Sequence, residues 1–395
     1  MNKGDARPMS VLNIDRPDLL KEEDIAIFRQ SVGRFLDEHA PPTRAARWRE
    51  DGVVDRAMWT EAAEAGLLCL SVSAEYGGGG GDYRHEVVLI EELAARGLGS
   101  FAISLHNAIV VPYILNYGSH EQKTNWLPRL ASGELVSAIA MSEPGAGSDL
   151  QGVRTTARRD GNHYVVSGQK TFISNGQTAD LIVVVAKTDS SLGAKGTSLI
   201  VVETGDAEGF HRGRNLDKLG MEAQDTSELF FDDVRVPTAN LLGPQEGMGF
   251  VQLMQQLPQE RLNIAVGAAA TIERALDLTI AYVKERKAFG SRLIDFQNTQ
   301  FKLAECKTEA TVARIFVDRL IALHVEGKLD APTASMAKYW VTDLENKIVD
   351  ECLQLFGGYG YMSEYPISHM FRDSRVQRIY GGANEIMKVL IARTL

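Results

Sequence analysis

The chain has 395 residues, of which 44% are hydrophobic and 24% are charged. It is therefore long enough for two or three domains and can bury a large core, which argues against a disordered, collagen-like or coiled-coil protein. The 42 Lys and Arg residues are outnumbered by 52 Asp and Glu residues, and the formal net charge of −10 opposes nonspecific binding to nucleic acid or to an anionic membrane.

Cysteine and histidine usage argues against a disulfide framework and a metal site. Cys69, Cys306 and Cys352 lie far apart in the sequence, so we expect buried free thiols. The eight histidines form no HxH or HExxH pattern. No apolar run approaches the roughly 18 residues of a membrane span, and residues 1–20 lack the apolar stretch of a secretory signal. We expect a soluble protein of the cytoplasm, or of the mitochondrial matrix in a eukaryote.

Helical patterns dominate the first third of the chain. Over residues 25–36, apolar side chains recur at steps of three and four, which predicts an amphipathic helix. A second helix is predicted over 85–96. It follows the glycine run 77–81, which favours a surface turn.

The middle of the chain changes from helical to strand-like patterns, and helices then return. Short apolar or β-branched runs separated by Gly, Asp, Asn and Ser predict an antiparallel sheet or small barrel, and no alternating helices support a parallel Rossmann sheet. These runs are 164–166, 181–185, 198–203 and 229–232. From about residue 247 onward long helical patterns predict a bundle, with one helix over 331–356 that ends at two glycines.

The segment 140–149, AMSEPGAGSD, interrupts an apolar stretch with proline and glycine. Its small residues let a ligand approach backbone N–H groups closely. It lacks the Gly-Lys-Ser/Thr ending of a Walker A loop, and Leu150 stands where a dinucleotide-binding pattern has its last glycine. A structural turn and a binding loop are both compatible with this segment.

The segment 168–176 combines an aromatic residue and a hydroxyl on a predicted strand. Phe172 and Ser174 are two positions apart and therefore point to the same face. Together they either stack on and hydrogen-bond to a planar ligand, or pack into the core as an aromatic with a satisfied serine.

Glu260 lies in the segment 258–262, PQERL, which the pattern places at the start of a long helix. A carboxylate there usually interacts favourably with the helix dipole. A carboxylate in an apolar pocket can instead have its pKa raised and act as a general base. The residues alone leave both readings open.

Two further regions combine charge, aromatic rings and glycine. The segment 285–290, with Gln297 beyond it, offers an arginine for a pyrophosphate and an aromatic for a purine, or forms a solvated basic turn. The glycine-rich segments 354–361 and 379–385 are either ligand-binding turns or packing turns.

These five segments, in this order and spacing, resemble the acyl-CoA dehydrogenase family over nearly the whole chain, from residue 23 to 393. The first matches the family's signature, in which an apolar residue and Ser or Thr precede Glu, two residues and Ala-Gly-Ser-Asp. The resemblance implies an α+β fold with an N-terminal α-helical domain, a central antiparallel β-barrel domain and a C-terminal four-helix bundle. We assign them to residues 1–134, 135–246 and 247–395.

The resemblance also implies a bound FAD, with contacts assigned by motif position. Phe172 would lie against the isoalloxazine ring, and Met141 and Ser142 would contact the flavin. In this family the pyrophosphate and adenosine contacts come from an adjacent subunit, which implies an oligomer, most often a homotetramer. The full set of implied FAD contacts is Met141, Ser142, Ser148, Phe172, Ile173, Ser174, Arg286, Phe289, Gln297, Gln354, Leu355, Phe356, Gly357, Gly358, Ala383, Asn384 and Glu385.

The position of the catalytic base separates branches of the family. Many members carry a glutamate directly after the Ile-Tyr of the last segment, where this chain has Gly381. The long-chain and isovaleryl branches place it just before the counterpart of Arg261, and Glu260 stands there. The chain therefore looks most like the long-chain branch, which implies Glu260 as the base. The implied substrate contacts are Ser148, Arg261, Tyr380, Gly381 and Gly382.

The implied reaction is the α,β-dehydrogenation of an acyl-CoA thioester to a trans-2-enoyl-CoA. Glu260 removes the α-proton, a hydride passes to flavin N5, and electron-transferring flavoprotein accepts the electrons. Two alternatives stay open: an acyl-CoA oxidase that uses oxygen, and a catalytically silent flavoprotein that serves as a binding module.

Overall fold

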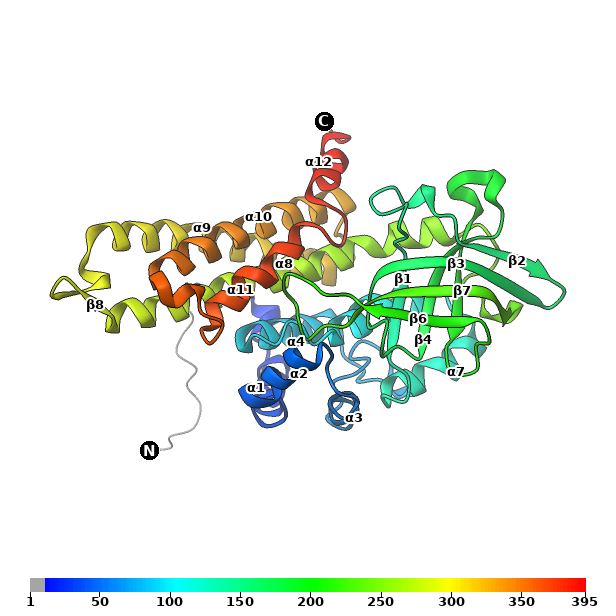
Figure 1. Ribbon diagram of the computed structural model, residues 1–395, viewed down its shortest axis with the longest axis horizontal. Helices are drawn as coiled ribbons and strands as arrows, with labels where there is room; N and C mark the ends of the chain where they lie inside the picture. Colours follow the sequence, from blue (N-terminus) through cyan, green and yellow to red (C-terminus); the bar gives the residue numbers. More distant parts are fainter. Residues whose placement is uncertain (1–10) are drawn as a thin grey trace. The chain divides into compact units, whose positions relative to one another are not determined.

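A computed structural model describes residues 11–395 of the protein (Figure 1). These residues form two compact units. The sheet unit contains Gln30–Leu89 and Ser100–Glu260, and the bundle unit contains the described part of Met1–Arg29 together with Ile90–Gly99 and Arg261–Leu395. The boundaries of this division fall within α1 (Glu23–His39), α4 (Tyr83–Arg96) and α8 (Gly249–Glu285).

Helices make up the first part of the sheet unit. Besides α1 and α4 they are α2 (Pro42–Asp51), α3 (Arg56–Glu64), α5 (Ile103–Leu105), the π-helix η3 (His106–Val110), α6 (Val111–Tyr117) and α7 (His120–Ala131). The predicted helix over 85–96 is confirmed within α4. The glycine run before it forms a turn, in which a Cβ on Gly78 would lie 2.3 Å from the carbonyl oxygen of Val72.

Seven strands form a single sheet. They are β1 (Ser137–Ala140), β2 (Thr156–Asp160), β3 (His163–Ser174), β4 (Leu181–Lys187), β5 (Thr197–Glu203), β6 (Phe210–Asn215) and β7 (Thr226–Pro237). Their order is β1-β4-β2-β3-β7-β6, and β5 also pairs with β4. The four predicted strand runs lie in β3, β4, β5 and β7. Most pairs are antiparallel as predicted, but β4 pairs parallel with β1 and at one position with β2, so the sheet is mixed.

Strand β4 is buried on both faces, which explains its continuous apolar sequence. Leu181, Val183 and Val185 pack in a core cluster with residues of α6 and α7, including Tyr113. The alternate residues of β4, such as Val184, pack in a second cluster with strands β3 and β7. Because successive side chains of a strand point to opposite faces, β4 contributes residues to both core clusters.

Long helices form the bundle unit. After α8, a short hairpin of β8 (Lys287–Ala288) and β9 (Ser291–Arg292) leads into α9 (Gln297–Val325), α10 (Ala331–Phe356), α11 (Pro366–Ser374) and α12 (Asn384–Ala392). The predicted helix over 331–356 coincides with α10. Its N-terminus is capped by Asp330, which accepts a hydrogen bond from the N–H of Thr333, and it ends at Gly357 with φ +58°.

The start of α8 differs from the prediction. The sequence pattern placed Pro258 and Glu260 at a helix start, but α8 begins at Gly249, so both residues lie in its interior. Proline is usually tolerated only in the first helical turn because it lacks an N–H. The sequence therefore predicted that the helix begins at Pro258. Since the helix dipole acts mainly within the first turn, it does not account for the placement of Glu260.

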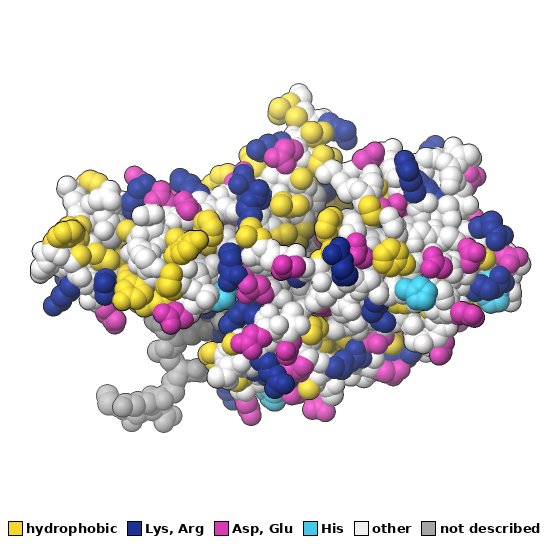
Figure 2. All heavy atoms as spheres, in the orientation of Figure 1, with side chains coloured by type: hydrophobic (Ala, Val, Ile, Leu, Met, Phe, Trp, Pro, Cys, Tyr) yellow, Lys and Arg dark blue, Asp and Glu magenta, His cyan; other side chains and the backbone are white. Residues whose placement is uncertain are grey.

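The surface and the cysteines are those of an ordinary globular chain. Charged side chains of both signs are interspersed over the face shown in Figure 2. No helix within residues 11–395 is long and apolar enough to span a membrane. Cys69, Cys306 and Cys352 are buried and free, as predicted. Within the same residues, no cluster of three His, Cys, Asp or Glu side chains is arranged to hold a metal ion.

Candidate active site

Two of the predicted cofactor-binding segments lie side by side in the sheet unit. The backbone N–H of Thr171 donates to the carbonyl oxygen of Ser142 over 3.0 Å, which joins the loop 141–149 to strand β3. Met141 and Ser142 are half-buried, and Ser148 is exposed. The structure thus brings together the residues of two motifs that are about thirty positions apart in the sequence.

A buried ion pair holds this loop on the sheet. The ammonium of Lys170, which is 1% exposed, lies 2.8 Å from Oε1 of Glu143 and donates to the carbonyl oxygen of Met141 over 3.1 Å. Glu143 accepts hydrogen bonds from the backbone N–H groups of Arg154 and Thr155 at 2.7 and 3.0 Å. Burial lowers the pKa of Lys170 to about 8, so it stays cationic at neutral pH. Burial opposes ionisation of Glu143 as well, but the charge of Lys170 outweighs it and lowers the pKa of that carboxyl.

Phe172 is held out of the core by its backbone. Its side chain is 69% exposed, and its φ is +59°, a left-handed conformation that costs a non-glycine residue about 1–2 kcal/mol. The neighbouring Ile173 is buried in the core of the sheet, and Ser174 is half-buried. An exposed aromatic ring on a strained backbone is typical of a functional site, where a ligand covers the ring.

Glu260 is buried and bonded to a tyrosine. Its residue exposure is 5%, and the hydroxyl of Tyr113 on α6 donates to its Oε1 over 2.7 Å. Tyr113 is fully buried. Burial, followed by the charge of Glu260, raises the pKa of Tyr113 well above its usual value, so the phenol is a neutral donor. Sequence reasoning missed Tyr113, because nothing distinguishes it from an ordinary core tyrosine in an apolar helix.

Side-chain amides fix this part of α8 against α6 and the π-helix before it. Gln259 donates to the carbonyl oxygen of Ala108 over 2.8 Å. The hydroxyl of Tyr117, one turn beyond Tyr113, lies 2.9 Å from Oε1 of Gln255 and accepts a hydrogen bond from Gln256 over 3.1 Å. Short π-helical segments such as η3 are frequent at functional sites because they shift the register of the following side chains.

In the bundle unit, predicted cofactor residues gather at the β8–β9 hairpin. The guanidinium of Arg286 lies over the ring of Tyr359 at 5.1 Å. Phe289 is 98% exposed, with its ring 6.4 Å from that of Phe296, and Gln297 is the exposed first residue of α9. An exposed cation, aromatic ring and amide are therefore grouped at one end of the bundle unit.

The end of α10 belongs to the same group. Gln354, Gly357 and Gly358 are exposed, and Leu355 is half-buried. Phe356 is buried, however, and stacks on Tyr282 at 4.2 Å between ring centroids, so its side chain has a packing role.

Lys338 stabilises the turn at Gly381 and Gly382. It is fully buried in α10, and its ammonium donates to the carbonyl oxygen of Gly382 over 2.7 Å and to Oδ1 of Asn384 over 2.9 Å. The φ values of the two glycines are +63° and +96°. A Cβ on Gly381 would lie 2.4 Å from Cδ1 of Ile264, so the turn requires glycine there.

The other residues predicted around this turn differ in exposure. Tyr380 and Ala383 are half-buried, and Glu385 is exposed in the first turn of α12. The hydroxyl of Tyr380 donates to Oε1 of Gln377 over 2.8 Å. Arg261 is buried, and one of its guanidinium nitrogens lies 3.3 Å from Oγ of Ser335.

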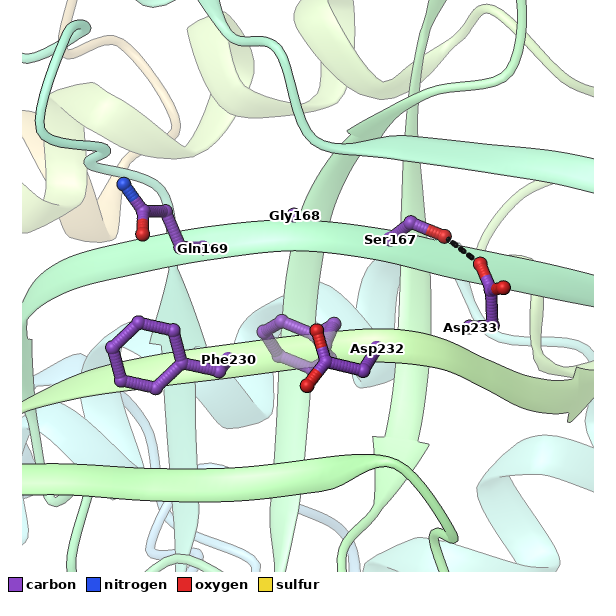
Figure 3. Close-up of a pocket in the computed structure, with 7 residues that line it drawn as sticks. Ser167, Gly168, Gln169, Phe230, Asp232 and Asp233 are labelled. Atoms are coloured by element: carbon purple, nitrogen blue, oxygen red, sulfur yellow. Dashed lines mark hydrogen bonds between the residues drawn. The ribbon is translucent and has the colours of Figure 1, made fainter.

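A separate open groove lies between strands β3 and β7 (Figure 3). Its lining includes Gln169, Phe230, Asp232 and Asp233, and the hydroxyl of Ser167 donates to Oδ1 of Asp233 over 2.6 Å. None of the residues predicted to contact FAD or substrate lines this groove.

The fold and these motif positions define a three-part α–β–α protein of the acyl-CoA-dehydrogenase type. Models of the acyl-CoA dehydrogenase N-terminal, middle and C-terminal domains match residues 22–134, 138–234 and 247–395. The chain belongs to the acyl-CoA dehydrogenase family, whose members are oxidoreductases. The predicted family and fold class are confirmed.

Individual relatives agree with this assignment. The mitochondrial long-chain specific acyl-CoA dehydrogenase of Mus musculus is 50% identical over 371 residues, which cover 93% of this chain and 86% of the relative. The acyl-CoA dehydrogenase of Geobacillus kaustophilus superposes with a TM-score of 0.92 at 49% identity, covering 94% and 98% of the two chains. A glutaryl-CoA dehydrogenase of Mycobacterium smegmatis in complex with FADH2 gives a TM-score of 0.88 at 30% identity, covering 95% of each chain.

Proposed function

We propose that this protein binds FAD and dehydrogenates an acyl-CoA thioester to a trans-2-enoyl-CoA, with Glu260 as the base that removes the α-proton. The observation that carries the proposal is the buried carboxylate of Glu260, which accepts a 2.7 Å hydrogen bond from Tyr113. Gly381 stands where many family members carry the base, so the competing carboxylate is missing from this chain.

The residues present fit a flavin. The exposed ring of Phe172 offers a flat apolar surface beside the loop that Lys170 and Glu143 hold in place. We propose that Met141, Ser142, Ser148, Phe172, Ile173 and Ser174 hold one part of the cofactor, and that the hairpin and the end of α10 of an adjacent subunit hold its pyrophosphate and adenosine. The turn 383–385 is a further proposed contact. Bound FAD supplies the acceptor for the hydride that leaves the β-carbon.

Proton abstraction is the step that the chain's own residues perform. The thioester carbonyl makes the α-proton acidic, and hydrogen bonds to its oxygen stabilise the enolate charge that develops. We propose the backbone N–H of Gly381 as one such donor, and Ser148, Arg261, Tyr380 and Gly382 as further substrate contacts. Because Glu260 is buried, little water solvates its carboxylate, which makes it a stronger base.

We also propose a homotetramer and transfer of electrons to electron-transferring flavoprotein. Phe301, Val312 and Ile315 lie on one face of α9 and are 58%, 52% and 57% exposed in the single chain. An apolar stripe of this kind is expected to pack against a second copy of the chain. The electron acceptor is inferred from the family alone.

Anaerobic reduction of the bound flavin by a panel of acyl-CoA thioesters tests the activity. We expect wild-type protein to lose its yellow colour with at least one thioester, and Glu260→Gln to retain FAD while its rate of flavin reduction falls about 10²–10⁴-fold. Near-native reduction by Glu260→Gln would overturn the base assignment. Absence of reduction by every thioester would favour a silent binding module, and rapid peroxide formation in air would favour an oxidase.

A further inference from the structure

We infer that Tyr113 is the positioning residue for Glu260: its buried hydroxyl, 2.7 Å from Oε1, orients the carboxylate and stabilises its ionised form. This inference rests on the proposed function, because it concerns how the proposed base is held ready to accept the α-proton.

The contact has the geometry of a hydrogen bond to a charged acceptor. O–H···O⁻ distances of about 2.5–2.7 Å are shorter than those between neutral groups. Tyr113 is 0% exposed, so no bulk water competes for its hydroxyl, and a buried phenol requires an acceptor. Oε1 of Glu260 is that acceptor.

The helices around the pair keep the phenol in place. Tyr113 is the third residue of α6, which follows the π-helix η3 directly, and its ring lies 6.2 Å from that of Tyr117. The bond from Gln259 to Ala108 ties the residue before Glu260 to η3. Both partners of the Tyr113–Glu260 bond are therefore anchored by independent contacts.

Few other titratable groups lie on the elements that carry this pair. Besides Tyr113, α6 carries only Tyr117, whose hydroxyl bonds to glutamines of α8. Glu260 is the one titratable residue in the part of α8 within the sheet unit, and Arg261 after it has a nitrogen near Ser335. His106 of η3 lies 3.0 Å from Oγ of Ser137.

The pH dependence of flavin reduction tests the effect of the phenol. A donor to a carboxylate favours its ionised form, so removal of the donor moves the acid limb of the rate profile to higher pH. A hydrogen bond of this strength corresponds to a displacement of about 1–2 pH units. Tyr113→Phe should therefore reduce flavin about 10–100-fold more slowly on the acid limb and approach the wild-type rate at alkaline pH.

Tyr117→Phe is the matched control, because it removes a hydroxyl from the same helix one turn away without touching Glu260. Rates are measured anaerobically by stopped-flow on FAD-loaded enzyme with saturating acyl-CoA, from about pH 5 to pH 9. We expect the acid limb of Tyr117→Phe to stay at the wild-type pH, even where the loss of its bonds to Gln255 and Gln256 lowers the overall rate. Coincident profiles for the two variants would overturn the role of Tyr113.

A second replacement tests the opposite direction and guards against misfolding of the phenylalanine variant. Substitution of Tyr113 by 3-fluorotyrosine keeps the shape of the ring and makes the phenol a stronger donor. The acid limb should then move to lower pH, and a limb that stays in place or moves up would contradict the inference. If Glu260→Gln is inactive while both changes at Tyr113 leave the profile unaltered, the proposed function stands and this inference alone fails.

Discussion

A glutamate that the proposed reaction does not use provides a sharp test of the buried electrostatics. Glu86 lies on α4 and is 1% exposed. Neither of its carboxylate oxygens makes a well-formed hydrogen bond to the described residues. Burial raises the pKa of Glu86 to about 8, and the nearby amide of Asn107 offsets only a small part of that effect. Glu86 should therefore be mostly protonated in the folded protein at neutral pH.

This pKa makes the stability of the folded protein depend on pH. Between the ordinary glutamate value of 4.5 and a pKa of about 8, the folded state binds more protons than the unfolded state. The free energy of unfolding then falls by about 1.4 kcal/mol for each pH unit of increase in that range. The loss reaches about 3 kcal/mol at pH 7 and at most about 5 kcal/mol above pH 8.

Glu86→Gln removes this dependence and keeps the size of the side chain. We expect the variant to gain stability relative to the wild type as the pH rises from about 5 to 8, and the difference to level off above that value. Any fixed cost of burying the amide shifts the whole curve without changing its slope. The measurement is urea unfolding of the FAD-loaded protein, followed by circular dichroism at a series of pH values.

Glu64→Gln is the control, because Glu64 is exposed at the end of α3. Its stability difference from the wild type should not change across the same pH range. A pH-independent difference for Glu86→Gln as well would show that Glu86 is ionised in the folded protein, and would refute the reasoning from burial.

Two further substitutions test the supports of the site. Lys170→Met should cost about 3–5 kcal/mol in urea unfolding, because it leaves Glu143 buried without its cation; a loss below about 1 kcal/mol would contradict that role. The double variant with Glu143→Gln should lose less than the sum of the single changes. Gly381→Ala should lower the free energy of unfolding by about 1–2 kcal/mol, since alanine resists a φ of +63° and its Cβ meets Ile264. An unchanged thermal midpoint would mean that the turn relaxes freely.

The elements that the sequence predicted well are those in which local pattern and burial agree. Strand β4 is a continuous apolar run because it packs on both faces. Helix α10 has an aspartate cap at one end and glycine at the other. In both elements the residues themselves carry the signals that determine the boundaries.

The elements that escaped prediction depend on distant partners. Strands β2 and β6, with sequences TARRD and FHRGRN, contain too many charged residues to indicate strands by themselves. They form because β3 and β7 offer backbone hydrogen bonds along their edges. The start of α8 was misplaced for the opposite reason, since Pro258 is a strong local signal that tertiary packing overrides.

In the candidate site, too, some residues could be predicted from local sequence motifs and others depend on distant partners. Motif spacing predicted the loop at Ser142, the strand at Phe172 and Glu260 as the proposed base. It gave no sign of the groups that hold them, because Tyr113 is 147 positions from Glu260 and Lys338 is 44 positions from Gly382. Such contacts depend on how helices pack, and each supporting residue is unremarkable in its own segment.

The buried glutamates of this chain show why a neutral donor suits a base. Glu91 has three arginine side chains within 2.8 Å, and Glu143 has Lys170 at 2.8 Å, so cations hold both carboxyls ionised. No cation among residues 11–395 pairs with Glu86, and burial raises its pKa to about 8. A base must accept the α-proton and later release it. A carboxyl that cations hold ionised resists accepting the proton, and a carboxyl that burial holds protonated resists releasing it. Tyr113 gives Glu260 a neutral donor, and its hydrogen bond favours the carboxylate without itself adding a full positive charge.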